Sequence, residues 1–160
     1  MTPRARRWLP TVAAALACAL LAACGDGRAW MEANRADSAA ADRAIERGEL
    51  PEAARHLASI AEREPPRGVA EEDARVVRQD AYERWARLEM ERGDLSAARA
   101  RVERGLALGE REDVFTANLL TTRGRIAEAE GRDREAARDY HRALRIEEAL
   151  LDRALGGSDD

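Results

Sequence analysis

Apolar residues recur at every third or fourth position along most of the chain, which is the spacing of one face of an α-helix. Between residues 112 and 130, the core-facing positions advance by four, three, four and three residues, at Phe115, Leu119, Thr122, Ile126 and Ala129. Four further stretches show the same spacing, and from residue 28 to Leu155 no stretch alternates in the manner of a β-strand. The sequence therefore predicts an all-α fold.

Glycine and proline residues divide this pattern into about six helices. The main breaks fall at Gly48, at Pro65-Pro66, at Gly93, at Gly109 and at Gly131. The residues between them are mostly Ala, Arg, Glu and Leu, which are good helix formers. The predicted helices are 29–47, 51–63, 69–92, 95–108, 112–130 and 133–154.

Three helix junctions read alike. In each, a glycine ends one helix and an alanine follows five residues later inside the next helix. Glycine suits a helix C-terminus because it takes a positive φ without a Cβ clash, and we expect the alanine to let the two helices approach closely. The sequence thus predicts three antiparallel helix-turn-helix pairs, with junctions at Gly48/Ala53, Gly93/Ala98 and Gly131/Ala136.

The junctions resemble those of the tetratricopeptide repeat, a helix pair of about 34 residues. The resembling units are about 34–67, 79–112 and 117–150, and the resemblance implies a short tetratricopeptide-like solenoid over residues 29–155. The sequence departs from the family in two ways: extra residues lie between units, and most of the aromatic residues of the first helix are absent. An ordinary Ala-rich helical bundle is the alternative.

The first 24 residues form a separate pattern. Three arginines precede an apolar stretch of about 14 residues, which is short for a helix that crosses a hydrocarbon core of roughly 30 Å. A positive head, a short apolar body and small residues at its end are typical of a secretory signal.

The end of this leader, Leu21-Ala22-Ala23-Cys24, resembles the lipobox of bacterial lipoproteins. The resemblance implies a signal peptide over 1–23, diacylglyceryl modification of the Cys24 thiol, and a lipidated tether over 24–28. Gly25 follows the cysteine in place of the aspartate that retains lipoproteins of this family at the inner membrane, which favours the outer membrane facing the periplasm. The alternative is a plain signal peptide, or a membrane anchor left uncut.

Composition narrows the choice of partner. The net charge is −4, and the leader holds three arginines and no acid, so the rest of the chain is more negative. This balance does not suggest nucleic-acid binding. The only two cysteines are Cys18, which would leave with the leader, and Cys24. After lipidation the fold would have no disulfide, and the polar tail 156–160 is expected to be flexible.

The sequence contains few of the motifs that are typical of enzyme active sites. His56 and His141 are the only histidines, they lie on different predicted helices, and their spacing is that of no common zinc motif. No nucleophile elbow and no phosphate-binding glycine loop is present. We therefore expect no enzyme activity, no cofactor, no catalytic residue and no metal site.

A binding groove is the stronger hypothesis. In the tetratricopeptide family, the first helix of each pair lines a concave groove. The resemblance places Arg87 and Arg125 at the same repeat position, where two guanidinium groups could hold a carboxylate or the carbonyls of a peptide. The alternative is that both arginines only form surface ion pairs. The candidate groove residues are Asp42, Glu83, Arg87, Asn118, Thr121 and Arg125.

Two functions follow as hypotheses. The first is a lipid-anchored adaptor or scaffold that binds a protein or peptide partner of the cell envelope. The second is a protein that binds cell-wall fragments or another small ligand, or an accessory subunit of an enzyme; it requires an enclosed cavity with converging polar groups. A third hypothesis is that the partner is another copy of this chain, bound through the Ala-rich end faces of the stack.

Overall fold

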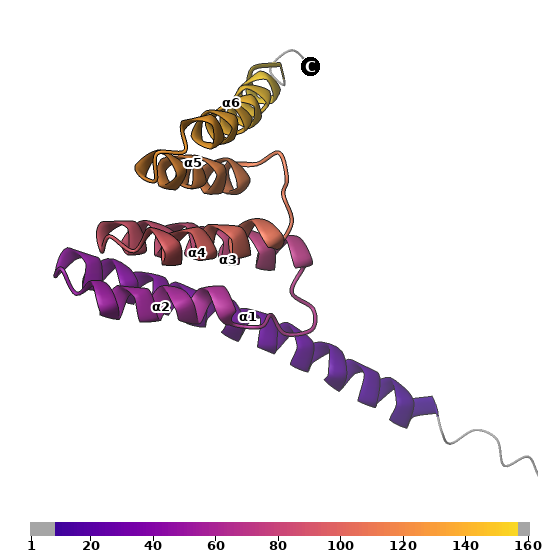
Figure 1. Cartoon of the computed structure of the whole chain (residues 1–160). Helices are drawn as coiled ribbons and strands as arrows, with labels where there is room; N and C mark the ends of the chain where they lie inside the picture. Colours follow the sequence, from indigo (N-terminus) through magenta and orange to yellow (C-terminus); the bar gives the residue numbers. More distant parts are fainter. Residues whose placement is uncertain (1–8, 157–160) are drawn as a thin grey trace, which may run out of the picture.

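Within residues 9–156 the chain folds into six α-helices that stack as three antiparallel pairs (Figure 1). This computed structural model describes the backbone of residues 9–156 and the side chains of residues 26–156, and no strand is present in that part. Five helices begin and end within two residues of their predicted bounds. The helices are α1 (Leu9–Glu46), α2 (Leu50–Glu62), α3 (Glu71–Glu91), α4 (Leu95–Ala107), α5 (Val114–Ala129) and α6 (Asp133–Gly156).

The three predicted junctions have one geometry. Gly48, Gly93 and Gly131 take φ values of 72°, 79° and 71°. At each, the amide of the next residue donates to the carbonyl five residues before it, at 2.8–2.9 Å, as in a Schellman motif. The repeat read from the sequence is therefore a repeat of backbone structure.

In each pair, the first helix carries a small residue seven positions before the junction glycine. These residues, Ala41, Ala86 and Gly124, are all buried. The junction alanines on the second helix of each pair are at most 4% exposed. Small side chains at these positions allow the two helices of a pair to lie close together.

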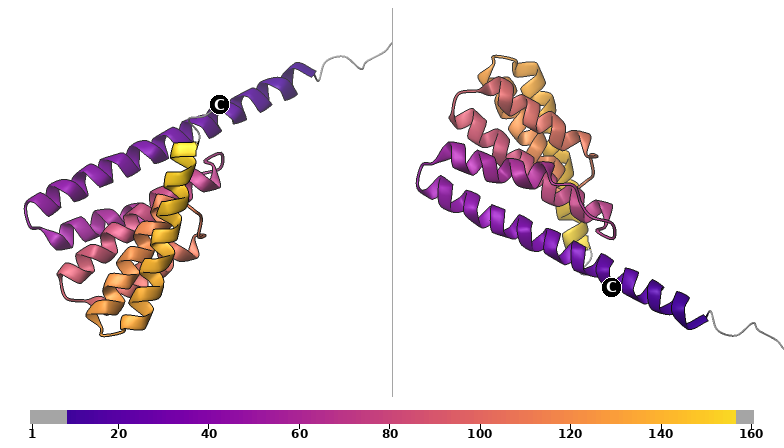
Figure 2. Two further views of the ribbon diagram at one scale, coloured as in Figure 1. Left: turned by 90° about the horizontal axis from the view of Figure 1, so that it is seen from above. Right: turned by 90° about the horizontal axis from the view of Figure 1, so that it is seen from below.

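The core consists of two clusters that tie successive pairs into one stack. The first joins α1 and α2 to one side of α3, around Leu57 and Trp85. The second joins α3 and α4 to α5 and α6, around Val102 and Leu119. Figure 1 shows the pairs in this order, with α1 and α6 at opposite ends of the stack, and Figure 2 views the same stack from above and from below.

The helix that the sequence predicts to begin at residue 29 begins at Leu9, so the predicted tether 24–28 lies within α1. Helix α1 runs without interruption from Leu9 and projects from the stack (Figure 1). An isolated glycine costs a helix only about 1 kcal/mol, and alanine-rich flanks can offset this cost. From Gly27 onward α1 belongs to the folded domain, because a Cβ on Gly27 would lie 3.4 Å from Cγ2 of Val69.

Candidate partner-binding groove

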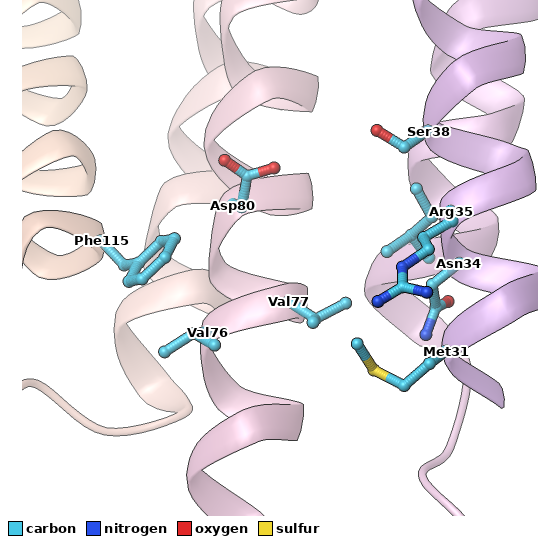
Figure 3. A pocket seen from close by; sticks show the side chains of 9 residues that line it. Met31, Asn34, Arg35, Ser38, Val76, Val77, Asp80 and Phe115 are labelled. Carbon is cyan, nitrogen blue, oxygen red and sulfur yellow. The ribbon is translucent and has the colours of Figure 1, made fainter. Parts of the chain in front are cut away.

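An apolar pocket of about 250 Å³ lies between α1, α3 and the start of α5 (Figure 3). Helical spacing on α1 brings Met31, Asn34, Arg35 and Ser38 to its wall. Val76, Val77 and Asp80 face them from α3, Ile60 contributes from α2, and Phe115 closes the far side. The pocket has room for a medium-sized apolar side chain.

One polar group at this wall, the amide of Asn34, is only partly satisfied. Asn34 is 4% exposed, and its Oδ1 accepts a hydrogen bond of 2.5 Å from Nη1 of Arg63. A guanidinium can only donate, so the oxygen must face Arg63 and the NH₂ group must face away from it. Within residues 26–156 this buried Nδ2 has no partner, which is costly unless the pocket wall opens enough for a ligand or a water molecule to supply an acceptor.

The rim of the pocket carries further donors. Arg35 is exposed and has no ion pair in the described part of the chain. Ser38 Oγ accepts a hydrogen bond of 2.9 Å from Arg84, which leaves the hydroxyl hydrogen of Ser38 free to donate. Asp80 is the one carboxylate in the wall; partial burial raises its pKa, although Arg84, 4.0 Å away, opposes the effect. The pocket therefore suits an apolar group beside hydrogen-bond acceptors.

The groove continues along α1 and α3 beyond Arg84. This side chain bridges the two helices through Ser38 and Asp42 and divides the groove into two parts. The second part, about 200 Å³, is lined mainly by charged side chains, including Asp42, Arg87 and Glu91. One end of the groove is thus apolar and the other is charged.

Two predicted groove residues, Asp42 and Arg87, line this charged end, while Glu83 lines neither part of the groove. Asp42 pairs with Arg84, and Arg87 lies 4.0 Å from Glu83. Glu83 is largely buried and accepts a hydrogen bond of 2.8 Å from Thr122. Burial raises the pKa of Glu83, and the Thr122 hydroxyl and Arg87 offset only part of the effect.

The predicted residues of α5 stand apart from both pockets. Asn118 and Arg125 are exposed and Thr121 is half-buried, and none of them lines either part of the groove. Arg125 has no ion pair within the described residues, so ion pairing explains Arg87 better than Arg125. In this structure, α5 contributes Phe115 to the groove.

Asn34, Met31, Val77 and Phe115 were not among the predicted site residues. The predicted residues lie about one or more turns away from these four: Asn118 is three residues after Phe115, and Asp42 and Glu83 lie nearer the junctions than Asn34 and Val77. An asparagine inside an otherwise apolar and alanine-rich helix face was the available signal, since a buried amide needs partners.

A cluster of Asp37, His56 and Ser59 has residue types of a catalytic triad but not its arrangement. His56 Nδ1 lies 2.9 Å from Asp37 Oδ1, and Ser59 Oγ donates to Asp37 Oδ2 at 3.0 Å. His56 Nε2 faces Glu52 at 3.3 Å and not the serine, so nothing in the cluster activates a nucleophile. The cluster joins α1 to α2.

The other sequence predictions concern features that this structure leaves open. The side chains of Leu21, Ala22, Ala23 and Cys24, and the tail from residue 157, lie outside the described residues. In the part described, no three His, Cys, Asp or Glu side chains come together as metal ligands. No helix in that part has the length and apolarity needed to cross a membrane.

Comparison of the chain with protein-family models, with curated proteins and with solved structures found no match.

Proposed function

We propose that this protein is a lipid-anchored adaptor of the cell envelope that binds a protein or peptide partner in the groove between α1 and α3. Cys24 would carry the lipid, since the four residues that end the leader match the lipobox pattern. Two or three acyl chains hold a protein at a bilayer almost permanently, because each buried CH₂ contributes about 0.8 kcal/mol.

The unpartnered Asn34 amide in an apolar pocket is the observation that supports the binding role most directly. A peptide offers both groups that this site lacks: a side chain for the space between Met31, Val77 and Phe115, and a backbone carbonyl for Nδ2 of Asn34. The charged part of the groove beyond Arg84 would meet polar groups of the same segment.

The groove is tested by capturing partners from membranes with the full chain and its variants. Asn34→Asp keeps the oxygen that faces Arg63 but replaces the donor NH₂ by an acceptor, so we expect the captured partner to be lost. Val77→Phe fills the pocket with a larger side chain, so we expect it to abolish capture of the partner as well. Ala36→Asp, on an exposed position of α1, adds the same charge outside the groove and is the control.

The predicted joint role of Arg87 on α3 and Arg125 on α5 is tested by a separate variant. Arg87→Ala with Arg125→Ala removes both guanidinium groups of the shared repeat position. If this double variant no longer captures the partner while Asn34→Asp still does, the partner binds at the predicted positions of Arg87 and Arg125 and not in the apolar pocket. Capture by every variant would show that the groove is not the binding surface.

The anchor is tested separately by incorporation of labelled palmitate. We expect label in the wild-type chain and in Cys18→Ala, and none in Cys24→Ala. The two cysteines are six residues apart in the same leader, so the first variant controls for general effects on export. Equal labelling of both variants would contradict lipidation at Cys24.

A further inference from the structure

The last helix presents a row of leucines that nothing in the described chain covers. Leu144, Leu151 and Leu155 are 52%, 57% and 66% exposed. They are spaced by seven and four residues, which places them on one face of α6. Helix α6 is the outermost helix of the stack, opposite α1 (Figure 1), so this face looks away from the other pairs.

The repeat shows what kind of surface this is. Leu144 lies thirteen residues after its junction glycine, as Ala61 and Leu106 do in the first two units. Ala61 is fully buried in the cluster that includes α3, and Leu106 is 6% exposed in the cluster that includes α5. The position is therefore one at which a pair stacks on the next pair, and the third unit has no successor in residues 9–156.

Charges beside the leucines change sign along the helix. On the flank that lies about 40–100° from the leucine row, His141 and Arg145 precede Glu148 and Asp152. Arg138 extends the basic half. Within the described residues these side chains form no ion pair, and all of them are exposed. One half of the flank is basic and the other half is acidic.

From this arrangement we propose that α6 pairs in antiparallel orientation with α6 of a second copy of the chain. Antiparallel helices that share a leucine row bring the same flank of each helix together, with the basic half of one against the acidic half of the other. Arg145 then faces Glu148 of the second copy, and His141 faces Asp152. The face is self-complementary, so the assembly closes at a dimer.

The two-fold axis makes disulfide trapping a sharp test. A pairing of Arg145 with Glu148 places the axis between residues 146 and 147, so a cysteine at Glu148→Cys lies within half a turn of the axis and close to its own symmetry mate. We expect this variant of the full chain to form a disulfide-linked dimer under mild oxidation. Arg134→Cys, on an exposed position more than three turns away, should not, and the unaltered chain controls for Cys18 and Cys24.

Sedimentation of the detergent-solubilised full chain measures the dimer without a cross-link. Leu144→Glu with Leu151→Glu removes two leucines from each copy and should raise the dissociation constant of the dimer roughly 100-fold or more. Val114→Glu, which changes an apolar side chain of similar exposure away from α6, should leave it unchanged. Circular dichroism establishes that each variant is folded.

Charge exchange separates a second copy from another partner. Arg145→Glu and Glu148→Arg should each weaken the dimer, and the two together should restore it. A chain that stays monomeric at all concentrations, or equal trapping at residues 134 and 148, would overturn the proposal. The groove variant Asn34→Asp should still form the dimer, so this test is independent of the proposed function.

Discussion

The ring of Tyr140 occupies the space that a side chain on Gly124 would need. A Cβ built on Gly124 would lie 2.6 Å from Cε1 of Tyr140, closer than real Cβ contacts. The two equivalent pairs in the other units are Ala41 with Leu57 and Ala86 with Val102. The third unit thus combines a larger side chain on its second helix with the smallest residue on its first.

This relationship predicts that the effect of Gly124→Ala on the stability of the fold changes sign when Tyr140 is replaced. Gly124→Ala alone should destabilise the fold by about 1–3 kcal/mol, because the ring must leave its packed position. In the background of Tyr140→Leu, the same change should stabilise by about 0.5–1 kcal/mol, since alanine is the better helix former. Urea unfolding of the four chains measures both effects. A stabilising Gly124→Ala in the wild-type background would contradict the packing.

The fold was predictable because its determinants are local. A junction glycine, an alanine five residues later and a small residue seven positions earlier each act within one helix pair. Residues such as Gly48 and Ala53 therefore indicate the same structure in sequence and in space. The start of α1 was not predictable, because its glycines act as breakers only when nothing else sustains the helix.

The groove was less predictable because it depends on residues far apart in sequence. Phe115 joins Met31 and Val77 only after three pairs have stacked. The orientation of Asn34 depends on Arg63, 29 residues away. Likewise, no local pattern indicates that Arg84 would divide the groove by binding Ser38 and Asp42.

A buried glutamine ties α3 to the end of α4 within the second pair, and its loss should destabilise the stack. Gln79 is fully buried, and its Nε2 donates to the carbonyls of Gly105 and Gly109 at 3.1 and 3.0 Å, while Arg75 donates to its Oε1. Gln79→Leu removes these hydrogen bonds from buried groups and should cost about 1–3 kcal/mol.

Thermal unfolding measured by circular dichroism provides the comparison. Asn118→Leu replaces an exposed polar side chain of α5 by the same apolar residue, and should change the stability by less than about 0.5 kcal/mol. Equal effects of the two substitutions would show that the buried network of Gln79 does not stabilise the stack.

Two aspartates predict that the fold is lost in acid. Burial acts to raise the pKa of Asp37, but hydrogen bonds from Arg63, His56 and Ser59 lower it below its ordinary value. In Asp113, burial is similarly outweighed by the Thr116 amide and by Arg75. The unfolded chain therefore binds more protons than the folded chain below about pH 4, and the free energy of unfolding falls as the pH drops through that window.

Asparagine substitutions test this pH dependence. Asp37→Asn and Asp113→Asn should each destabilise the fold at pH 7 and make its stability less dependent on pH between about 5 and 2. The control is Asp73→Asn, which changes an exposed carboxylate with no ion pair in the described chain. An unchanged slope in both aspartate variants would mean that other carboxylates govern acid unfolding.

Glu83, which lies 4.0 Å from Arg87 of the groove, predicts the opposite dependence of stability on pH. Because burial raises its pKa, the folded chain holds this proton more tightly than the unfolded chain. The free energy of unfolding should therefore fall as the pH rises from about 4.3, the ordinary pKa of glutamate, through the raised value. Glu83→Gln keeps an oxygen for Thr122 and removes the charge, so it should stabilise the fold at pH 7 and abolish this part of the pH dependence.

The same substitution separates stability from binding. A charge that destabilises the fold and lies beside a candidate site is expected to be retained for function. Glu83→Gln should then raise the melting temperature and weaken partner capture together. Glu71→Gln, at an exposed position of the first turn of α3, should do neither. A more stable variant with full capture would show that Glu83 takes no part in binding, while a less stable one would mean that the Arg87–Glu83 pair outweighs the cost of burial.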